Sequence, residues 1–329
     1  MIKISKKTLQ DLEYESVVEQ IAELNVTSLG KTKILNTVPF SNRNEVIRSL
    51  NLTNEFLTSF ENENRIPNHG FEDITKELKL IKIENNFLEI NGFRKIASCC
   101  ITSNILIKFF KKHKDYYPLL NTLSSTNEIN TIIPDAINDV IDKHGEIRNN
   151  ASDLLYTTRK SIQSVRTKVN SSFNSALSTY NSAEYLDDIR ETVMENRRVL
   201  AVKSMHRRKV KGSILGSSKT GSIVYIQPEA TFQYARELNN LEFEESEEVD
   251  KILRHLTEYI RPYTSALESY QNFLASLDVI FAKAKHAQSI NGILPQINEN
   301  KVYEAKDAFH PLLYLSNKNQ GKTTFPQSI

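Results

Sequence analysis

Apolar residues recur at helical spacing along most of this chain. The pattern is present in residues 8–24, 43–60, 72–84, 92–113 and 127–144, where apolar side chains fall on one face of an amphipathic helix. Breaks fall at Pro39, between Pro67 and Gly70, and at Pro118. We therefore predict a helical core domain over residues 1–145.

From about Glu146 the apolar stripe changes to a period of eleven residues. One register of this period contains Ile147, Thr158, Val169 and Tyr180, and the whole stripe adds Ala151, Leu154, Ile162, Val165, Phe173 and Ala176. Eleven residues over three turns is about 3.67 residues per turn, so such a helix can stay nearly straight. Residues 146–196 are predicted to form the outgoing lever helix of a long arm.

The same period returns further along the chain, in Leu238, Val249 and Ile260. Two long helices with matching stripes should pack on each other, so residues 229–290 are predicted to return antiparallel to the first helix. Pro262 should kink this returning helix, because proline removes a backbone donor and crowds the preceding turn. Residues 291–329 are predicted to be a linker.

Between the two long helices the chain has to reverse direction, and residues 197–228 are the non-helical sequence available. Three short β-branched runs, Val199–Lys203, Val210–Leu215 and Ile223–Ile226, are separated by SMHRRK and GSSKTGS. This pattern predicts a small antiparallel sheet of three or four strands. The expected fold is therefore mainly α, with a helical core domain and a long antiparallel two-helix lever arm that carries a small antiparallel β clamp at its tip.

Basic residues are concentrated in the predicted sheet. They are Arg197, Arg198, Lys203, Arg207, Arg208, Lys209, Lys211 and Lys219, with no acidic residue from Arg197 to Gln227. The whole chain carries a net charge of only +2, so this local excess favours contacts with nucleic-acid phosphates. A solvated tip without a partner is the alternative. The GSSKTGS loop could cradle a phosphate or be a simple turn.

The returning helix has the opposite charge. Its acidic residues are Glu237, Glu242, Glu244, Glu245, Glu247, Glu248 and Asp250. We interpret them as a solvated helix face that also repels nucleic acid from the shaft of the arm.

Other composition narrows the possible functions. Charged residues make up 25% of the chain, no apolar run approaches the roughly 20 residues of a membrane span, and the N-terminus lacks the apolar region of a secretory signal. A cytoplasmic location without a membrane partner is expected. Cys99 and Cys100 are adjacent within an apolar stretch, which indicates core packing rather than a disulfide or a zinc site.

No motif predicts catalysis or a metal site. Gly321, Lys322 and Thr323 resemble the end of a phosphate-binding loop, but Ser316 stands where that motif needs glycine, and Pro326 interrupts the helix that should follow. The histidines do not form HxxxH or HExxH pairs. We expect no catalytic residue, no metal and no cofactor in this chain.

Several segments in order resemble a known family. They are HGEIRNNAS (144–152), ETVMENRRVLAVK (191–203), GSSKTGSIVYIQPEA (216–230), ELNNLEFEE (237–245), LDVIFAKAKHA (277–287) and FHPLL (309–313). Together they are similar to the second type of the bacterial MutS family, whose chain starts directly with the core domain. LEYESVVEQIA and the LGK at 29–31 resemble its opening.

The resemblance implies a helical core, two lever helices and a β clamp that contacts nucleic-acid backbone, such as branched or double-stranded DNA, in DNA repair and the control of recombination. Arg197, Arg198 and Lys203 match the basic strand of the clamp, and Ser217–Gly221 matches its hairpin loop. That loop reads SSKTG, whereas the family commonly has an acidic residue there.

In full-length members the chain continues into an ATPase domain that uses ATP and magnesium and carries the homodimer interface, often followed by a nuclease domain. This chain ends before the Walker motif, so we expect neither activity of it. The alternative function is a coiled-coil arm for protein interaction, whose basic tip docks an acidic protein or a ribosomal complex.

Overall fold

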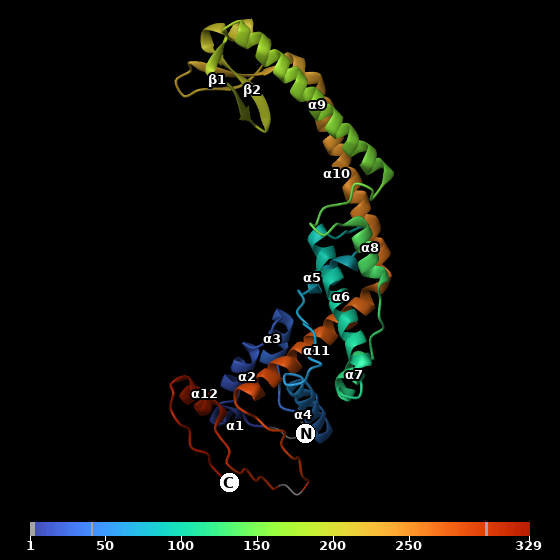
Figure 1. The fold of residues 1–329 in the computed structure, drawn as a ribbon, viewed down its shortest axis with the longest axis vertical. Helices are drawn as coiled ribbons and strands as arrows, with labels where there is room; N and C mark the ends of the chain where they lie inside the picture. The colour runs from blue at the N-terminus through green and yellow to red at the C-terminus, as the bar shows by residue number, and fades with distance from the viewer. Residues whose placement is uncertain (1–3, 41, 300–301) are drawn as a thin grey trace. The chain divides into compact units, whose positions relative to one another are not determined.

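The chain is mainly α-helical with one small antiparallel sheet, as the apolar periodicity predicted. The structure, a computed structural model, describes residues 4–40, 42–299 and 302–329 (Figure 1). Two units can be distinguished: Met1–Gly145 with Leu256–Ile329, and Glu146–His255. Residues 1–3 and 41 of the predicted core domain and residues 300–301 of the predicted linker lie outside the described residues.

The first unit is built from helices. They are α1 (Lys6–Asp11), α2 (Tyr14–Ala22), α3 (Ser28–Leu35), α4 (Arg43–Thr58), α5 (Thr75–Ile81), α6 (Ile90–Lys112), α7 (Pro118–Ser124), α8 (Ile132–Val140), α11 (Thr264–Ser289) and α12 (Pro311–Asn319). The helix expected over residues 8–24 is broken where Glu13 adopts a left-handed conformation with φ of 49°. The predicted linker contains α12 and a β-bridge between Ala308 and Gln327.

Helix α11 is the centre of the first unit. It packs against α2, α3, α4, α5 and α6, and Leu267, Tyr270, Leu274 and Leu277 on it are at most 1% exposed. A helix that meets neighbours on so many sides has to be apolar around most of its surface. This explains why its sequence shows a continuous apolar pattern rather than a narrow stripe.

Asp278 of α11 ties the N-terminal segment to this centre. Its carboxylate is fully buried and accepts hydrogen bonds from the backbone amides of Val26 and Thr27 and from the hydroxyl of Thr27, at 2.6 to 3.0 Å. His69 Nε2 lies 3.0 Å from the same carboxylate. Burial would raise the pKa of Asp278, but the hydrogen bonds from His69, Thr27 and Val26 outweigh burial and hold that pKa below its ordinary value.

Pro262 interrupts the long returning helix, as predicted. Helix α10 (Phe232–Ile260) ends there, the 3-10 turn η3 (Arg261–Tyr263) contains the proline, and α11 follows directly. Proline fits the first turn of a helix because no intrahelical partner is lost at that position.

The second unit contains an antiparallel pair of long helices, α9 (Asp153–Ser182) and the part of α10 up to His255. Three contacts fix their direction. Ser152 donates to Glu248 at 2.8 Å, Arg159 pairs with Glu245 at 2.7 Å, and Arg166 pairs with Glu242 at 2.8 Å. Residue numbers rise on α9 while they fall on α10, so the helices run in opposite directions.

The buried stripe of α9 follows the predicted period with one correction. Leu155, Thr158, Ile162, Val165 and Phe173 are buried. Leu154, which the period predicts to be buried, is 54% exposed, and its neighbour Leu155 is buried instead. Ser152 caps the N-terminus of this helix: its side chain accepts a hydrogen bond from the Leu155 amide and so satisfies one free donor of the first turn.

The outgoing helix is shorter than the prediction of 146–196. It ends at Ser182, and Glu184 follows with a φ of 62°. The chain then forms β1 (Leu186–Met194) where helix was expected. Leu186 belongs to the apolar core of the sheet. The sequence of this segment fits a helix or a strand, and packing against the other strands decides for the strand.

Four strands form one antiparallel sheet in the order β1-β2-β4-β3. The others are β2 (Arg197–Lys203), β3 (Gly212–Ser217) and β4 (Ile223–Pro228). Its core unites α9 with the strands through Phe173, Leu186, Leu200, Val202, Val210, Val224 and Ile226. The sheet therefore has an apolar core of its own, to which the end of α9 contributes.

Candidate nucleic-acid interface

The predicted basic residues do not form one uniform patch. Arg198 on β2 is largely occupied by its own chain: it donates to Glu191 at 2.6 Å and to Asn170 and Asn174 at 3.2 and 3.1 Å. Its guanidinium also lies 4.2 Å from the centre of the Phe173 ring. These contacts hold Arg198 against α9, so its charge is already balanced within the protein.

The other strand residues contribute less free charge than the sequence predicted. Arg197 is exposed, with a weak contact of 3.5 Å from Nη1 to Gln227 Oε1. Lys203, at the end of β2, is half-buried, and its backbone amide donates to the Tyr185 carbonyl at 3.0 Å. Of these two, only Arg197 presents an exposed side chain.

The densest exposed charge lies in the 3-10 turn η1 (Ser204–Lys209), which connects β2 to β3. Arg207, Arg208 and Lys209 are consecutive and exposed. Lys209 Nζ lies 5.1 Å from the centre of the Tyr185 ring, and the His206 ring packs on the same tyrosine at 4.8 Å. Tyr185 thus packs against Lys209 and His206, while Arg207 and Arg208 remain exposed.

A shallow depression of about 450 Å³ adjoins this turn. It is lined by Arg207, Arg208, Val210, Lys211, Gly212, Ile214, Ile226, Glu229 and Phe232. Basic and apolar side chains from η1, β3, β4 and the start of α10 therefore meet at one place. The basic side chains there can hold an anion, while the apolar ones can contact an uncharged flat or aliphatic group.

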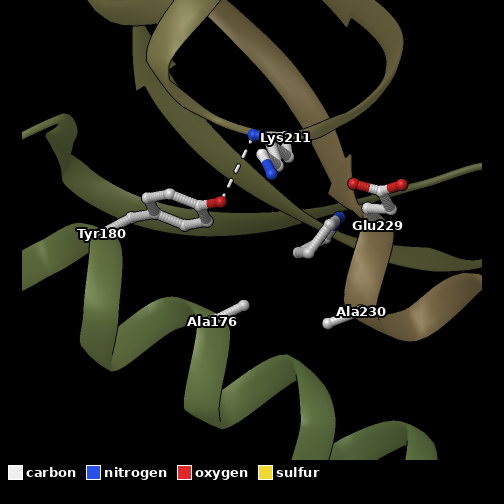
Figure 2. Close-up of a pocket in the computed structure, with 6 residues that line it drawn as sticks. Ala176, Tyr180, Lys211, Glu229 and Ala230 are labelled. Atoms are coloured by element: carbon white, nitrogen blue, oxygen red, sulfur yellow. Dashed lines mark hydrogen bonds between the residues drawn. The ribbon is translucent and has the colours of Figure 1, made fainter.

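A second depression, of about 350 Å³, shares Lys211 and Glu229 with the first. Figure 2 shows Tyr180 and Ala176 on α9 facing Lys211, Glu229 and Ala230. The backbone amide of Lys211 donates to the Tyr180 hydroxyl at 3.2 Å. This bond fixes the start of β3 on α9 and so sets the position of Lys211.

The hairpin loop between β3 and β4 behaves as a turn with its own hydroxyl network. The hydroxyls of Thr220 and Ser222 lie 2.8 Å apart, and the hydroxyls of Ser218 and Thr220 lie 3.3 Å apart. Gly221 has a φ of 69°, which glycine adopts without strain. Lys219 is exposed in this loop, away from the residues that line the two depressions.

Sequence reasoning missed the acidic strand beside the basic one. Asp187, Asp188 and Glu191 lie on β1, next to β2, in a segment predicted as helix. The sequence signal for this strand was the pair Glu195 and Asn196, which forms the turn between β1 and β2. Both residues have positive φ, at 49° and 60°. Two such residues between alternating apolar positions are typical of a tight hairpin, and asparagine tolerates that conformation.

Other predicted chemistry can be placed in the structure. Cys99 and Cys100 are buried and unpaired in α6, which confirms core packing, and burial raises the pKa of the Cys99 thiol to about 12. Gly321 follows the end of α12 with a φ of 66°. Within the described ranges, no three His, Cys, Asp or Glu side chains are grouped to hold a metal ion. None of the helices described there is long and apolar enough to cross a membrane.

No protein-family model matches the chain. It is similar to curated proteins named Endonuclease MutS2, with 26% identity over 312 residues in Alkaliphilus oremlandii and 28% over 310 residues in a Geobacillus strain. The corresponding protein of Aquifex aeolicus is 29% identical over 313 residues. The resemblance to MutS2 is confirmed. These alignments cover 93% or 94% of this chain.

The similarity extends over only part of each MutS2 relative. The chain spans 39% or 40% of the length of the relatives named above. The similarity therefore includes both the first unit and the sheet with its helices, while more than half of each MutS2 relative has no counterpart in this chain.

Proposed function

We propose that the sheet of the second unit is a clamp that binds the phosphate backbone of nucleic acid, with branched or double-stranded DNA as the ligand, and that α9 and α10 are its lever helices. The observation that supports this most is the run Arg207, Arg208 and Lys209 in η1, exposed and consecutive. Lysine and arginine that displace counterions from phosphates add affinity without reading sequence.

We propose fewer phosphate contacts than the sequence predicts. Lys211 and Arg197 are also exposed, whereas Arg198 is paired with Glu191. We propose that Arg198 positions β2 on α9 and that Arg207 and Arg208 are the principal phosphate ligands. The name of the relatives, Endonuclease MutS2, supports a nucleic-acid ligand, and we propose that this ligand is DNA and that the module acts in DNA repair and recombination control.

This chain by itself is proposed to be a binding module without enzymatic activity. ATP, magnesium and the homodimer interface would belong to the part of the relatives that has no counterpart here. Ser316 and Pro326 support this proposal, since both are incompatible with a functional phosphate-binding loop at Gly321.

A salt titration tests the proposal. Affinity of the full chain for duplex and for branched DNA should fall steeply as salt rises, with a slope of about −0.9 per phosphate contact. Reversing Arg207, Arg208 and Lys209 to glutamate should weaken binding to different sequences equally and flatten the slope by about one for each lost contact.

The matched control reverses Lys111, Lys112 and Lys114, which are exposed in the first unit. Equal losses from both triple variants would indicate diffuse electrostatics and contradict the clamp. Unchanged DNA affinity in the variant at η1 would favour the docking of an acidic protein or ribosomal complex instead. Circular dichroism of both variants should show the helicity of the unsubstituted chain, because these side chains are exposed.

A further inference from the structure

The depression beside η1 combines charge with exposed apolar surface. Ile214 on the edge strand β3 is 41% exposed, and Phe232 at the start of α10 is partly exposed and lies outside the sheet core. Val210 and Ile226 are at most 5% exposed and belong to that core. The proposed clamp uses contacts to phosphates, which do not read the bases, so this apolar wall has no role in the proposed function.

Glu229 decides how a nucleotide would lie in the depression. Glu229 lines both depressions, as does Lys211, and Figure 2 shows its side chain on the side of Lys211 and Ala230, across from Ala176 and Tyr180. A carboxylate disfavours a phosphate at its own position, because like charges repel. Phosphates should therefore be held at Arg207 and Arg208, and the uncharged part of the ligand should lie toward the apolar wall.

Bases of a single strand match the apolar wall. An unpaired base offers a flat face that packs on aromatic and aliphatic side chains in any sequence, while cations follow the backbone. The base faces of a duplex are stacked on one another and cannot make that contact.

We propose that this depression binds an unpaired nucleotide of single-stranded nucleic acid, with its base against Ile214 and Phe232 and its flanking phosphates on Arg207 and Arg208. The proposal rests on the proposed function, since it uses the same arginines for the backbone. It adds a preference for single-stranded regions, such as those at the junctions of branched DNA.

The test compares three fluorescent probes of equal length with the full chain: oligo-dT, the same backbone with abasic sites, and a duplex. Variants are Phe232→Ala and Ile214→Ser, the second because Ile214 is exposed at an edge strand and should not be needed for folding. Phe243→Ala is the matched control, since Phe243 is a 64% exposed phenylalanine on the same helix and does not line the depression.

Both variants should weaken oligo-dT binding by about fivefold or more, as expected for loss of one base contact. Binding to the abasic strand and to the duplex should change by less than about twofold, because phosphate contacts dominate there. Phe243→Ala should leave all three affinities unchanged. Helicity by circular dichroism confirms that each variant folds.

Equal losses on the oligo-dT and abasic probes, or no loss on either, would overturn the base contact. The proposed function is tested separately by reversing Arg207, Arg208 and Lys209. If that reversal weakens all probes while Phe232→Ala and Ile214→Ser change none, only the base contact fails. If the reversal leaves all probes unchanged, the phosphate clamp and the base contact both fail.

Discussion

Glu191 on β1 accepts hydrogen bonds from two nitrogens of Arg198 on β2, at 3.1 Å to Nε and 2.6 Å to Nη2. The guanidinium also covers the Phe173 ring of α9 at 4.2 Å. One arginine thus joins the edge strand, its neighbour and the helix beneath them. A residue that resembles a phosphate ligand in the sequence acts in the structure as a connection between elements.

Arg198→Ala should therefore reduce stability rather than DNA affinity. It removes an ion pair whose partners are about one-third exposed and a cation–π contact, which together contribute about 1–2 kcal/mol. Chemical denaturation followed by near-ultraviolet circular dichroism measures the loss. The salt slope of DNA binding should stay unchanged, and a slope flattened as much as in Arg207→Ala would make Arg198 a phosphate ligand after all.

Gly30→Ala should destabilise the first unit. A Cβ at this position would lie 2.0 Å from Asp278 Oδ2 and 2.7 Å from Asn25 Nδ2. Alanine gains about 1 kcal/mol of helix propensity over glycine, but overpacking in a closed site costs about 1–3 kcal/mol or more, so the steric effect prevails. Urea denaturation should show a lower midpoint.

Thr32→Ala provides the control in the same helix, because Thr32 is exposed and its hydroxyl donates to the Ser28 carbonyl of that helix at 2.9 Å. Its unfolding midpoint should stay close to that of the unsubstituted chain. A Gly30→Ala protein as stable as this control would show that Asp278 can move without cost.

Asp278 should make the free energy of unfolding depend on pH in the acidic range. The pKa of Asp278 in the folded state lies below its ordinary value, which is about 3.9 in an unfolded chain. The stability that the ionised carboxylate contributes is therefore fully present above about pH 4 and is lost as pH falls through the lower folded pKa. Asp278→Asn should cost about 1–3 kcal/mol at pH 7. The difference in unfolding free energy between the two proteins should shrink below about pH 4, and a constant difference would contradict the ionised state of Asp278.

The chain alone should not hydrolyse ATP, since Ser316 and Pro326 spoil the loop at Gly321. In a coupled assay, phosphate release from ATP should be no faster with the protein than with buffer alone. The matched variant is Lys322→Ala. Turnover that exceeds the buffer and disappears in this variant would refute the expectation, whereas turnover retained by it would indicate a contaminating enzyme.

The long helices and three of the four strands could be predicted because their patterns are regular. Phe173 and Ile162 fall in the eleven-residue stripe and are buried, and Pro262 marks a break that backbone chemistry requires. Leu154 was misplaced because it and Leu155 are both apolar neighbours, and only the direction of the partner helix decides which one is buried.

The candidate site was predicted in its charge but not in its geometry. The run at Arg207 and Arg208 is visible in the sequence, whereas the pairing of Arg198 depends on Glu191, seven positions away on a strand that was not predicted. The apolar wall depends on Phe232 and Ile214, which come from different elements. Contacts between separate elements are set by tertiary packing, so local patterns do not report them.

The ion pairs between α9 and α10 also constrain how this chain can diverge. Arg159 pairs with Glu245 and Arg166 with Glu242, and losing either arginine leaves its glutamate unpaired on a helix rich in glutamate. Descendants of this sequence should therefore change residues 159 and 245 together, and 166 and 242 together. Correlated substitution at these positions would preserve the alignment of the two helices through evolutionary drift, even where overall identity becomes low.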